Sequence, residues 1–121
     1  MEFDLRALPE SEHDRLLASV VVPRPIALLT TRSAAGIVNA APFSFFNLLG
    51  SSPAVVAVGI GEKSDGRPKD TRRNIVDTGE FVVNLVTFAA REAMNGTSIE
   101  AAADASEVDA LGLEIRPSVI V

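Results

Sequence analysis

The chain has 121 residues, of which 47% are hydrophobic and 22% charged, and its formal net charge is −5. This composition is typical of one globular domain, which we expect to cover residues 1–121. The acidic balance argues against a nucleic-acid or anionic-membrane partner, since both require a cationic surface. The sequence contains no cysteine, which excludes disulfides, thiol redox chemistry and thiolate metal sites.

No segment has the pattern of a signal peptide or a membrane span. The longest apolar run, at 53–60, has the length of a strand. We therefore expect a cytoplasmic protein. The only histidine, His13, stands between Glu12 and Asp14. We interpret it as a solvated helix residue, because metal sites usually need several convergent ligands, and we predict no metal site.

The first half of the chain predicts a short helix followed by a strand pair. Residues 11–20 have an apolar stripe behind a capping Ser11, and the Pro-Arg-Pro at 23–25 stops any helix. The aliphatic run 26–31 predicts a strand, 32–36 a turn, and 37–44 a returning strand. Pro42 must then occupy a position where no ladder donor is needed.

The second half alternates strands with short helices. After a break at 50–53, we expect a strand at 54–60 and a polar loop at 61–68. A helix is predicted at 71–78, with Asp70 as N-cap and Gly79 just past its end. A strand at 81–86, a helix at 89–95 closed by Gly96, a weak helix at 99–110 and a strand at 113–116 follow.

These short strands and small helices indicate a mostly β, α+β domain, with a barrel as its architecture. A parallel fold is disfavoured because strands 26–31 and 37–44 are joined too tightly for a crossover. The chain finishes on the apolar run Ser-Val-Ile-Val at 118–121. We expect from this that the natural protein is longer and that the domain is truncated here; the alternative is a terminal edge strand.

Five of the eleven cations fall between residues 63 and 73, at the start of the predicted helix: Lys63, Arg67, Lys69, Arg72 and Arg73. Helix N-termini offer free N–H groups and partial positive charge, which together suit a phosphate. Lys69 would add a point charge and Thr71 a hydroxyl donor. The alternative is a solvated basic loop before an ordinary capped helix.

The segment 39–47 concentrates three of the six phenylalanines beside one proline. In a strand, Phe43 and Phe45 point one way while Ser44 and Phe46 point the other. Ser44 can thus present a hydroxyl beside an aromatic surface, with further amides from Asn39 and Asn47. The alternative is that the phenylalanines simply pack in the core. Thr30 and Thr31 close the preceding strand; adjacent threonines are common in strands and alone indicate little.

The sequence offers no nucleophilic triad and no G-x-G-x-x-G or phosphate-loop motif. Nothing marks a particular pair of carboxylates either. Redox chemistry delegated to a cofactor is therefore the simplest interpretation, and we name no catalytic side chain. A flat, apolar group with an anionic end, as in a flavin nucleotide, matches the two segments described above.

The chain resembles the flavin reductase-like family of FMN-binding split-barrel proteins. The resemblance covers about residues 15–121, and its ordered motifs are 24–31, 36–39, 41–47, 69–71 with 74–75, 80–84, 94–95, 97–98 and 112–113. It implies a Greek-key split β-barrel, a homodimer with FMN near the interface, and hydride transfer from NADH or NADPH to flavin. Members include reductase components that serve a partner monooxygenase, and electron carriers of the flavoredoxin type.

By position, the resemblance assigns thirteen cofactor-binding residues: Thr30, Thr31, Asn39, Ala41, Pro42, Ser44, Phe45, Phe46, Asn47, Lys69, Asp70, Thr71 and Asn74. The last four would hold the phosphate end and the others the ring and ribityl chain. Arg72 departs from the apolar residue that relatives often have. Two alternatives stay open, an electron carrier without NAD(P)H activity and a split-barrel domain without cofactor; FAD in place of FMN is also open.

Overall fold

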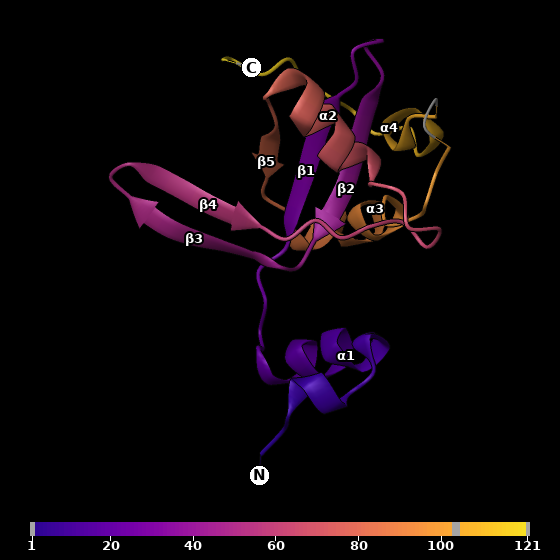
Figure 1. The fold of residues 1–121 in the computed structure, drawn as a ribbon. Helices are drawn as coiled ribbons and strands as arrows, with labels where there is room; N and C mark the ends of the chain where they lie inside the picture. The colour runs from indigo at the N-terminus through magenta and orange to yellow at the C-terminus, as the bar shows by residue number, and fades with distance from the viewer. Residues whose placement is uncertain (1, 103–104, 121) are drawn as a thin grey trace.

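The computed structural model describes residues 2–102 and 105–120. At its centre is an antiparallel three-stranded sheet in the order β2–β1–β5 (Figure 1). The strands are β1 (Ala27–Arg32), β2 (Val38–Phe43) and β5 (Val82–Asn84). Leu29 of β1 pairs with Ala41 on one side and with Val83 on the other. The strands expected at 26–31, 37–44 and 81–86 are thus confirmed, with ends that differ by one or two residues.

The core lies on one face of this sheet. Ala27 and Leu29 are fully buried and form a cluster with Phe43. Because strand side chains alternate, Thr31 shares the face of Ala27 and Leu29. Helix α2 (Asp70–Thr78) lies across β1 and β2, as Figure 1 shows.

The structure tests the residues that were predicted to begin and end α2. Gly79 ends the helix at a left-handed φ of 75°, as expected for a residue without a Cβ. The expected N-cap was wrong: Lys69 precedes the helix and Asp70 is its first residue, with no side-chain cap. The Asp70 carboxylate contacts Lys63 and Arg73 instead, and so it cannot serve the helix N–H groups.

A two-stranded hairpin, β3 (Phe46–Ser51) and β4 (Ala54–Val58), projects from the sheet (Figure 1). The strand expected at 54–60 is confirmed over 54–58, but β3 was missed. The break expected at 50–53 is narrower in the structure, because Gly50 and Ser51 still pair with β4 after a register shift between Leu48 and Gly50. A bulge of this kind lets a glycine stay within a strand.

The N-terminal segment holds the short helix η1 (Leu5–Ala7) and the helix α1 (Glu10–Val20), which buries none of its residues. In Figure 1 it stands apart from the sheet. The helix begins at Glu10 after Pro9, so Ser11 is not its cap. His13 is not simply solvated either, because its Nε2 lies 2.6 Å from the Leu5 carbonyl oxygen.

The C-terminal part contains η2 (Phe88–Ala90), α3 (Arg91–Gly96) and α4 (Glu107–Ala110). The helix expected at 89–95 is confirmed as η2 and α3, but Gly96 does not close it, because α3 includes Gly96 and Thr97 is the capping residue. Of the weak helix at 99–110, only α4 forms, and residues 103–104 lie outside the described part. The strand expected at 113–116 was wrong, since none of the described strands pairs with that segment.

Helix α4 covers the free edge of β2. Ser106 donates from its hydroxyl to the Val38 carbonyl at 2.7 Å, and the Ala40 N–H donates to the Glu107 carboxylate at 3.2 Å. Ser106 also caps α4, because its hydroxyl accepts from the Asp109 N–H. These bonds satisfy edge groups of β2 that would otherwise lack a partner.

Over residues 2–102 and 105–120, the helices are all too short or too polar to cross a bilayer.

Candidate functional site

A buried polar network joins α2 to β1 and β2. The Asn39 amide donates to the Thr71 hydroxyl at 2.9 Å, and the Asn74 amide donates to the Thr31 hydroxyl at 3.1 Å. The Asn39 amide also lies 3.5 Å from the Thr31 hydroxyl. Each of the four side chains is less than one-tenth exposed. Buried polar groups are usually satisfied in this way, and here the bonds hold the first turns of α2 against the sheet.

A cavity of about 190 Å³ lies beside this network, between β2, the start of α2 and the segment that follows α3. Six of the thirteen predicted residues line it: Asn39, Ala41, Pro42, Lys69, Asp70 and Thr71. The two motifs that the sequence placed 30 residues apart, 39–42 and 69–71, therefore meet at one cavity.

Positive charge reaches this cavity through Lys69. Its Nζ lies 5.9 Å from the centre of the Phe43 ring, and within the described ranges no carboxylate forms an ion pair with it. Neighbouring cations are already engaged, since Asp70 contacts Lys63 at 2.6 Å and Arg73 at 2.7 Å. Because α2 has no side-chain cap, its first N–H groups add to the field of Lys69. An anionic group is the ligand that this corner suits.

Seven predicted residues do not line the cavity: Thr30, Thr31, Ser44, Phe45, Phe46, Asn47 and Asn74. Thr31 and Asn74 are buried behind it in the polar network. Thr30 lies on the opposite face of β1, where it accepts from the Asn84 amide at 3.1 Å. Asn47 is exposed, and its side-chain oxygen accepts from the Leu48 N–H.

The aromatic end of the predicted site lies where β2 passes into β3. Phe46 packs against the core cluster, whereas Phe45 is about half exposed. Arg24 binds this corner: its Nε lies 3.4 Å from the Ser44 hydroxyl, and its guanidinium carbon lies 5.9 Å from the Phe45 ring centre. Arg24 also donates to backbone carbonyls at the end of α1, of Ala18 and Val21. Ser44 and Phe45 thus border a corner next to the cavity without facing into it.

The sequence reasoning missed several residues of the cavity, among them Phe43, Lys63, Thr97, Ser98, Ile99, Glu100, Ala101 and Glu107. Thr97 is fully buried and donates to the Met94 carbonyl at 2.7 Å. Glu107 is buried beside β2, in the stretch for which the sequence predicted only a weak helix. The only available signal was Ser106, a capping residue directly before Glu107.

One wall of the cavity is held by Glu100. Its carboxylate accepts from the Ser64 N–H at 3.0 Å and from the Ser64 hydroxyl at 2.7 Å. These bonds, the one from the hydroxyl first, hold the pKa of the exposed Glu100 carboxyl below its usual value. They tie the 61–68 loop to the segment after α3.

Comparisons with known proteins give this geometry a context. An uncharacterized protein from Halalkalibacterium halodurans is 47% identical over 121 residues, which is 100% of this chain and 58% of that protein. This chain thus spans less than two thirds of its relative's length. The structure of nitrilotriacetate monooxygenase component B from Bacillus cereus superposes with a TM-score of 0.92 at 30% identity, over 100% of this chain and 59% of that one.

A protein from Shewanella frigidimarina, described as a flavin reductase with a split barrel domain, superposes with a TM-score of 0.72 at 25% identity, over 93% of this chain and 56% of that one. The expected split-barrel fold with short helices is therefore confirmed. Residues 19–121 match the model of the flavin reductase like domain, and the chain belongs to that family.

Proposed function

We propose that this chain is the FMN-binding part of an NAD(P)H:flavin oxidoreductase, in which Lys69, Thr71 and the start of α2 hold the phosphate of FMN. One observation carries the proposal: Lys69 and the uncapped start of α2 meet the Asn39–Thr71 pair at a single cavity. Family membership supports a flavin as the bound group.

The cavity is large enough for only part of the proposed ligand. Sites for drug-sized ligands usually measure about 300–1,000 Å³. The cavity of about 190 Å³ therefore suits the phosphate and the ribityl chain and leaves the ring outside. The ring would lie along Pro42 and Ser44 toward Phe45, on the half-exposed aromatic corner that Arg24 binds.

The donors present fit such a ligand. Lys69 contributes charge, Thr71 a hydroxyl and Asn39 an amide, while the buried Glu107 carboxylate faces the same cavity and can accept from ribityl hydroxyls. A bound flavin supplies the redox chemistry, accepting a hydride from the nicotinamide ring. The protein's part is to fix the distance between the two rings and to exclude water from the space between them. No side chain of this chain has to act as general acid or base.

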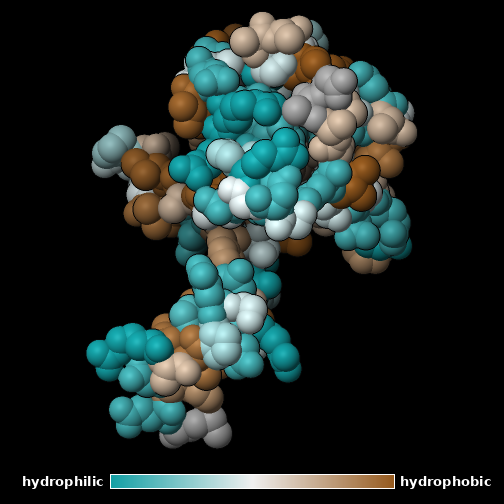
Figure 2. Space-filling view, turned by 45° about the vertical axis from the view of Figure 1, so that its right-hand side comes forward, coloured by the Kyte–Doolittle hydropathy of each residue, from teal (hydrophilic) through white to brown (hydrophobic). Residues whose placement is uncertain are grey.

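The chain's proposed partner is a second copy of itself. The β3–β4 hairpin exposes Leu48, Leu49, Val55 and Val56, and Figure 2 shows hydrophobic residues on this projection. An exposed apolar surface of this kind is typical of an interface. Since Phe45 stands at the base of the hairpin, a second copy seated there would cover the proposed ring site. By likeness to the monooxygenase component, a partner monooxygenase would consume the reduced flavin.

Titration of the purified chain with FMN, followed by NADH and NADPH, tests the function. We expect quenched flavin fluorescence on binding, and then bleaching of the flavin absorbance on addition of at least one reductant. The variant Lys69→Met should lose about tenfold in FMN affinity, as expected when a charge-assisted bond is removed without changing the buried Asn39–Thr71 bond.

Arg116→Gln is the matched control, because Arg116 is an exposed cation outside the cavity. If the chain binds FMN but neither NADH nor NADPH reduces the bound flavin, the alternative of an electron carrier without NAD(P)H activity is supported instead. An unperturbed flavin spectrum at micromolar protein would overturn the proposal.

A further inference from the structure

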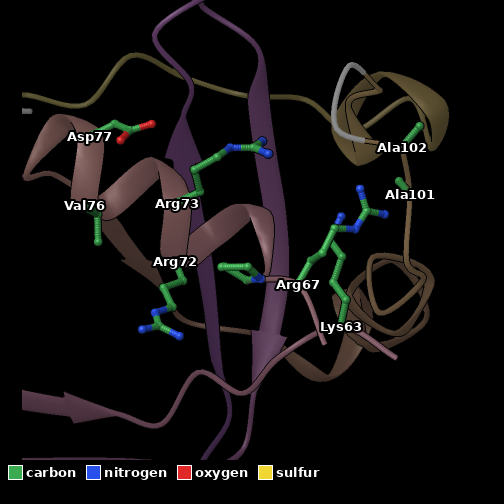
Figure 3. Close-up of a pocket in the computed structure, with 9 residues that line it drawn as sticks. Lys63, Arg67, Arg72, Arg73, Val76, Asp77, Ala101 and Ala102 are labelled. Atoms are coloured by element: carbon green, nitrogen blue, oxygen red, sulfur yellow. The ribbon is translucent and has the colours of Figure 1, made fainter. Parts of the chain in front are cut away.

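A second, larger cavity of about 430 Å³ lies on the outer side of α2. Its lining consists of Lys63, Arg67, Pro68, Arg72, Arg73, Val76, Asp77, Ala101 and Ala102. Figure 3 shows Arg72 and Arg73 on α2, across from Arg67 and Lys63. The volume falls within the usual range for sites of small organic ligands. None of the thirteen predicted flavin residues lines this cavity.

The charge of the lining indicates an anion. Four cations face one carboxylate, Asp77. Counting also Asp65 and Asp70, which pair with cations of the lining, positive charge still exceeds negative by one. The chain as a whole carries a net charge of −5, so this surface is locally positive in an acidic protein.

The cations of this cavity differ in how firmly they are held. Arg67 pairs with Asp65 at 2.7 Å, but both side chains are largely exposed, and such pairs are worth little. Arg67 can therefore turn to a ligand at low cost. Arg72 forms no ion pair within the described part of the chain. Lys63 and Arg73 share the mostly buried Asp70 and act as a fixed positive wall.

The apolar part of the lining suits a flat ring. Pro68, Val76, Ala101 and Ala102 are small or aliphatic, and guanidinium groups stack on aromatic faces. Arginine also binds phosphate through two parallel N–H bonds. Together, these side chains offer both a stacking surface and phosphate donors. An adenosine phosphate has both of the matching parts.

The two cavities are neighbours. Lys63 and Ala101 line both, and the Ser64–Glu100 bonds tie together the loop and the segment from which these two residues come. A ligand with one phosphate beside Lys69 could therefore continue past Lys63 into the larger cavity. A dinucleotide has the required chemistry, with two phosphates and an adenosine.

We propose that the larger cavity binds the adenosine-phosphate half of a dinucleotide. The physiological ligand would be either FAD or the pyridine dinucleotide that serves as reductant, and this assignment rests on the proposed function. Binding of an adenosine phosphate by itself does not, because the larger cavity needs no flavin. The two proposals can therefore fail separately.

Isothermal titration of the full chain with ADP and with 2′,5′-ADP tests this site directly. We expect saturable binding of at least one probe at micromolar to millimolar concentration, weakened about tenfold to a hundredfold in Arg67→Gln/Arg72→Gln. Both arginines are exposed, so the fold should persist. The control Arg91→Gln/Arg116→Gln removes the same charge from exposed positions outside both cavities and should bind like the wild type.

Flavin titrations then identify the source. If FAD supplies the adenosine half, FAD binds more tightly than FMN in the wild type, and the arginine double variant loses that difference. If the pyridine dinucleotide supplies it, the double variant raises the Kd of NADPH or NADH and leaves the two flavins equal. Either pattern supports the site.

Two results would overturn the inference. One is the absence of binding of both probes to the wild type up to millimolar concentration. The other is equal binding by the wild type and the arginine double variant. If the chain bound ADP but not FMN, the proposed function would be wrong and the proposed adenosine-phosphate site would still be supported. Lys69→Met, which changes only the smaller cavity, should weaken FMN and leave ADP affinity unchanged.

Discussion

Asn39 of β2 and Thr71 of α2 are 32 positions apart in the sequence, yet the Asn39 amide donates to the Thr71 hydroxyl at 2.9 Å in a buried position. This bond brings the strand that carries the aromatic motif to the beginning of the helix that carries the basic motif. Lys69, directly before α2, makes a second contact between these two elements, because its Nζ lies over the ring of Phe43 in β2. The two motifs therefore form one corner of the molecule.

We predict that Thr71→Val destabilises the chain. Valine has nearly the same shape but removes the hydroxyl, which leaves the Asn39 amide with only its long contact to Thr31. An unsatisfied buried donor costs about 1–3 kcal/mol, and we expect a loss of that size in the free energy of unfolding. Urea denaturation followed by circular dichroism measures it.

Thr78→Val is the matched control for this measurement. The Thr78 hydroxyl donates to the Asn74 carbonyl at the exposed end of the same helix, where water can replace it. We expect a change within about 0.5 kcal/mol. Equal losses for Thr71→Val and Thr78→Val would contradict the importance of the Asn39–Thr71 bond.

The sequence predicted the strands best where local pattern and tertiary packing agree. β1 alternates buried and half-buried residues, and its apolar run made it recognisable. β3 was missed because its residues are mostly exposed and Gly50 interrupts the pattern. The expected strand at 113–116 failed because a strand also needs a partner, which no local pattern supplies.

The candidate site was predictable only in part, for a related reason. Lys69 and Thr71 follow from rules for helix starts, which are local. Glu107 and Thr97 reach the same cavity through long-range packing of α4 and α3 against β2. Asp70 shows the limit most directly, because its charge suggested a cap or a ligand contact, whereas the structure uses it to hold Lys63 and Arg73.

This role of Asp70 leads to a second prediction. Asp70→Asn keeps the shape of the side chain but leaves two neighbouring cations without their counterion. Because the Asp70 side chain is only 12% exposed, we expect a loss of about 2 kcal/mol in the free energy of unfolding, below the cost of breaking a fully buried pair. Thermal or urea denaturation measures it. The loss should shrink at high salt, which screens the repulsion between Lys63 and Arg73.

The exposed pair of Asp65 and Arg67 provides the comparison for Asp70→Asn. Asp65→Asn removes the same charge from the loop that precedes α2, at a side chain that is 47% exposed. We expect a much smaller loss in the free energy of unfolding than for Asp70→Asn, because solvent screens exposed ion pairs. If both variants lost the same stability, Asp70 would be an ordinary surface charge.

A third prediction concerns acid. Hydrogen bonds from the Ser64 hydroxyl and N–H lower the pKa of Glu100 in the folded chain below its usual value of 4.5. A carboxyl with a lowered folded pKa adds stability above its unfolded pKa and loses that contribution as pH falls through the folded pKa. Glu100→Gln should therefore lower the free energy of unfolding at neutral pH. The difference from the wild type should become progressively smaller below pH 4.5.

Denaturation curves of Glu100→Gln and the wild type at pH 7 and below pH 4 compare these two conditions. Glu92→Gln, at an exposed acid with no bond to the 61–68 loop, serves as the control and should show no such convergence. A difference between wild type and Glu100→Gln that persisted unchanged in acid would show that the Ser64 bonds do not depend on the charge of Glu100.

The last prediction asks what covers the β3–β4 hairpin. Leu29→Ala and Leu49→Ala are the same chemical change at a fully buried and a 67% exposed position. Leu29→Ala should cost about 2–5 kcal/mol at any protein concentration, because it opens a cavity in the core. If a second copy seats on the hairpin, the cost of Leu49→Ala should be small in the dilute monomer and grow with concentration, since association stabilises only the intact surface.

Light scattering reports the same interface directly. Leu48→Ser/Leu49→Ser should convert a dimeric wild type to a monomer and, because Phe45 lies at the base of the hairpin, weaken FMN binding as well. Val76→Ser makes a comparable change at an exposed valine on α2 and should leave the mass unchanged. A wild type that stays monomeric at high micromolar concentration would exclude the second copy. The proposed ring site would then have to be closed by this chain's own aromatic corner.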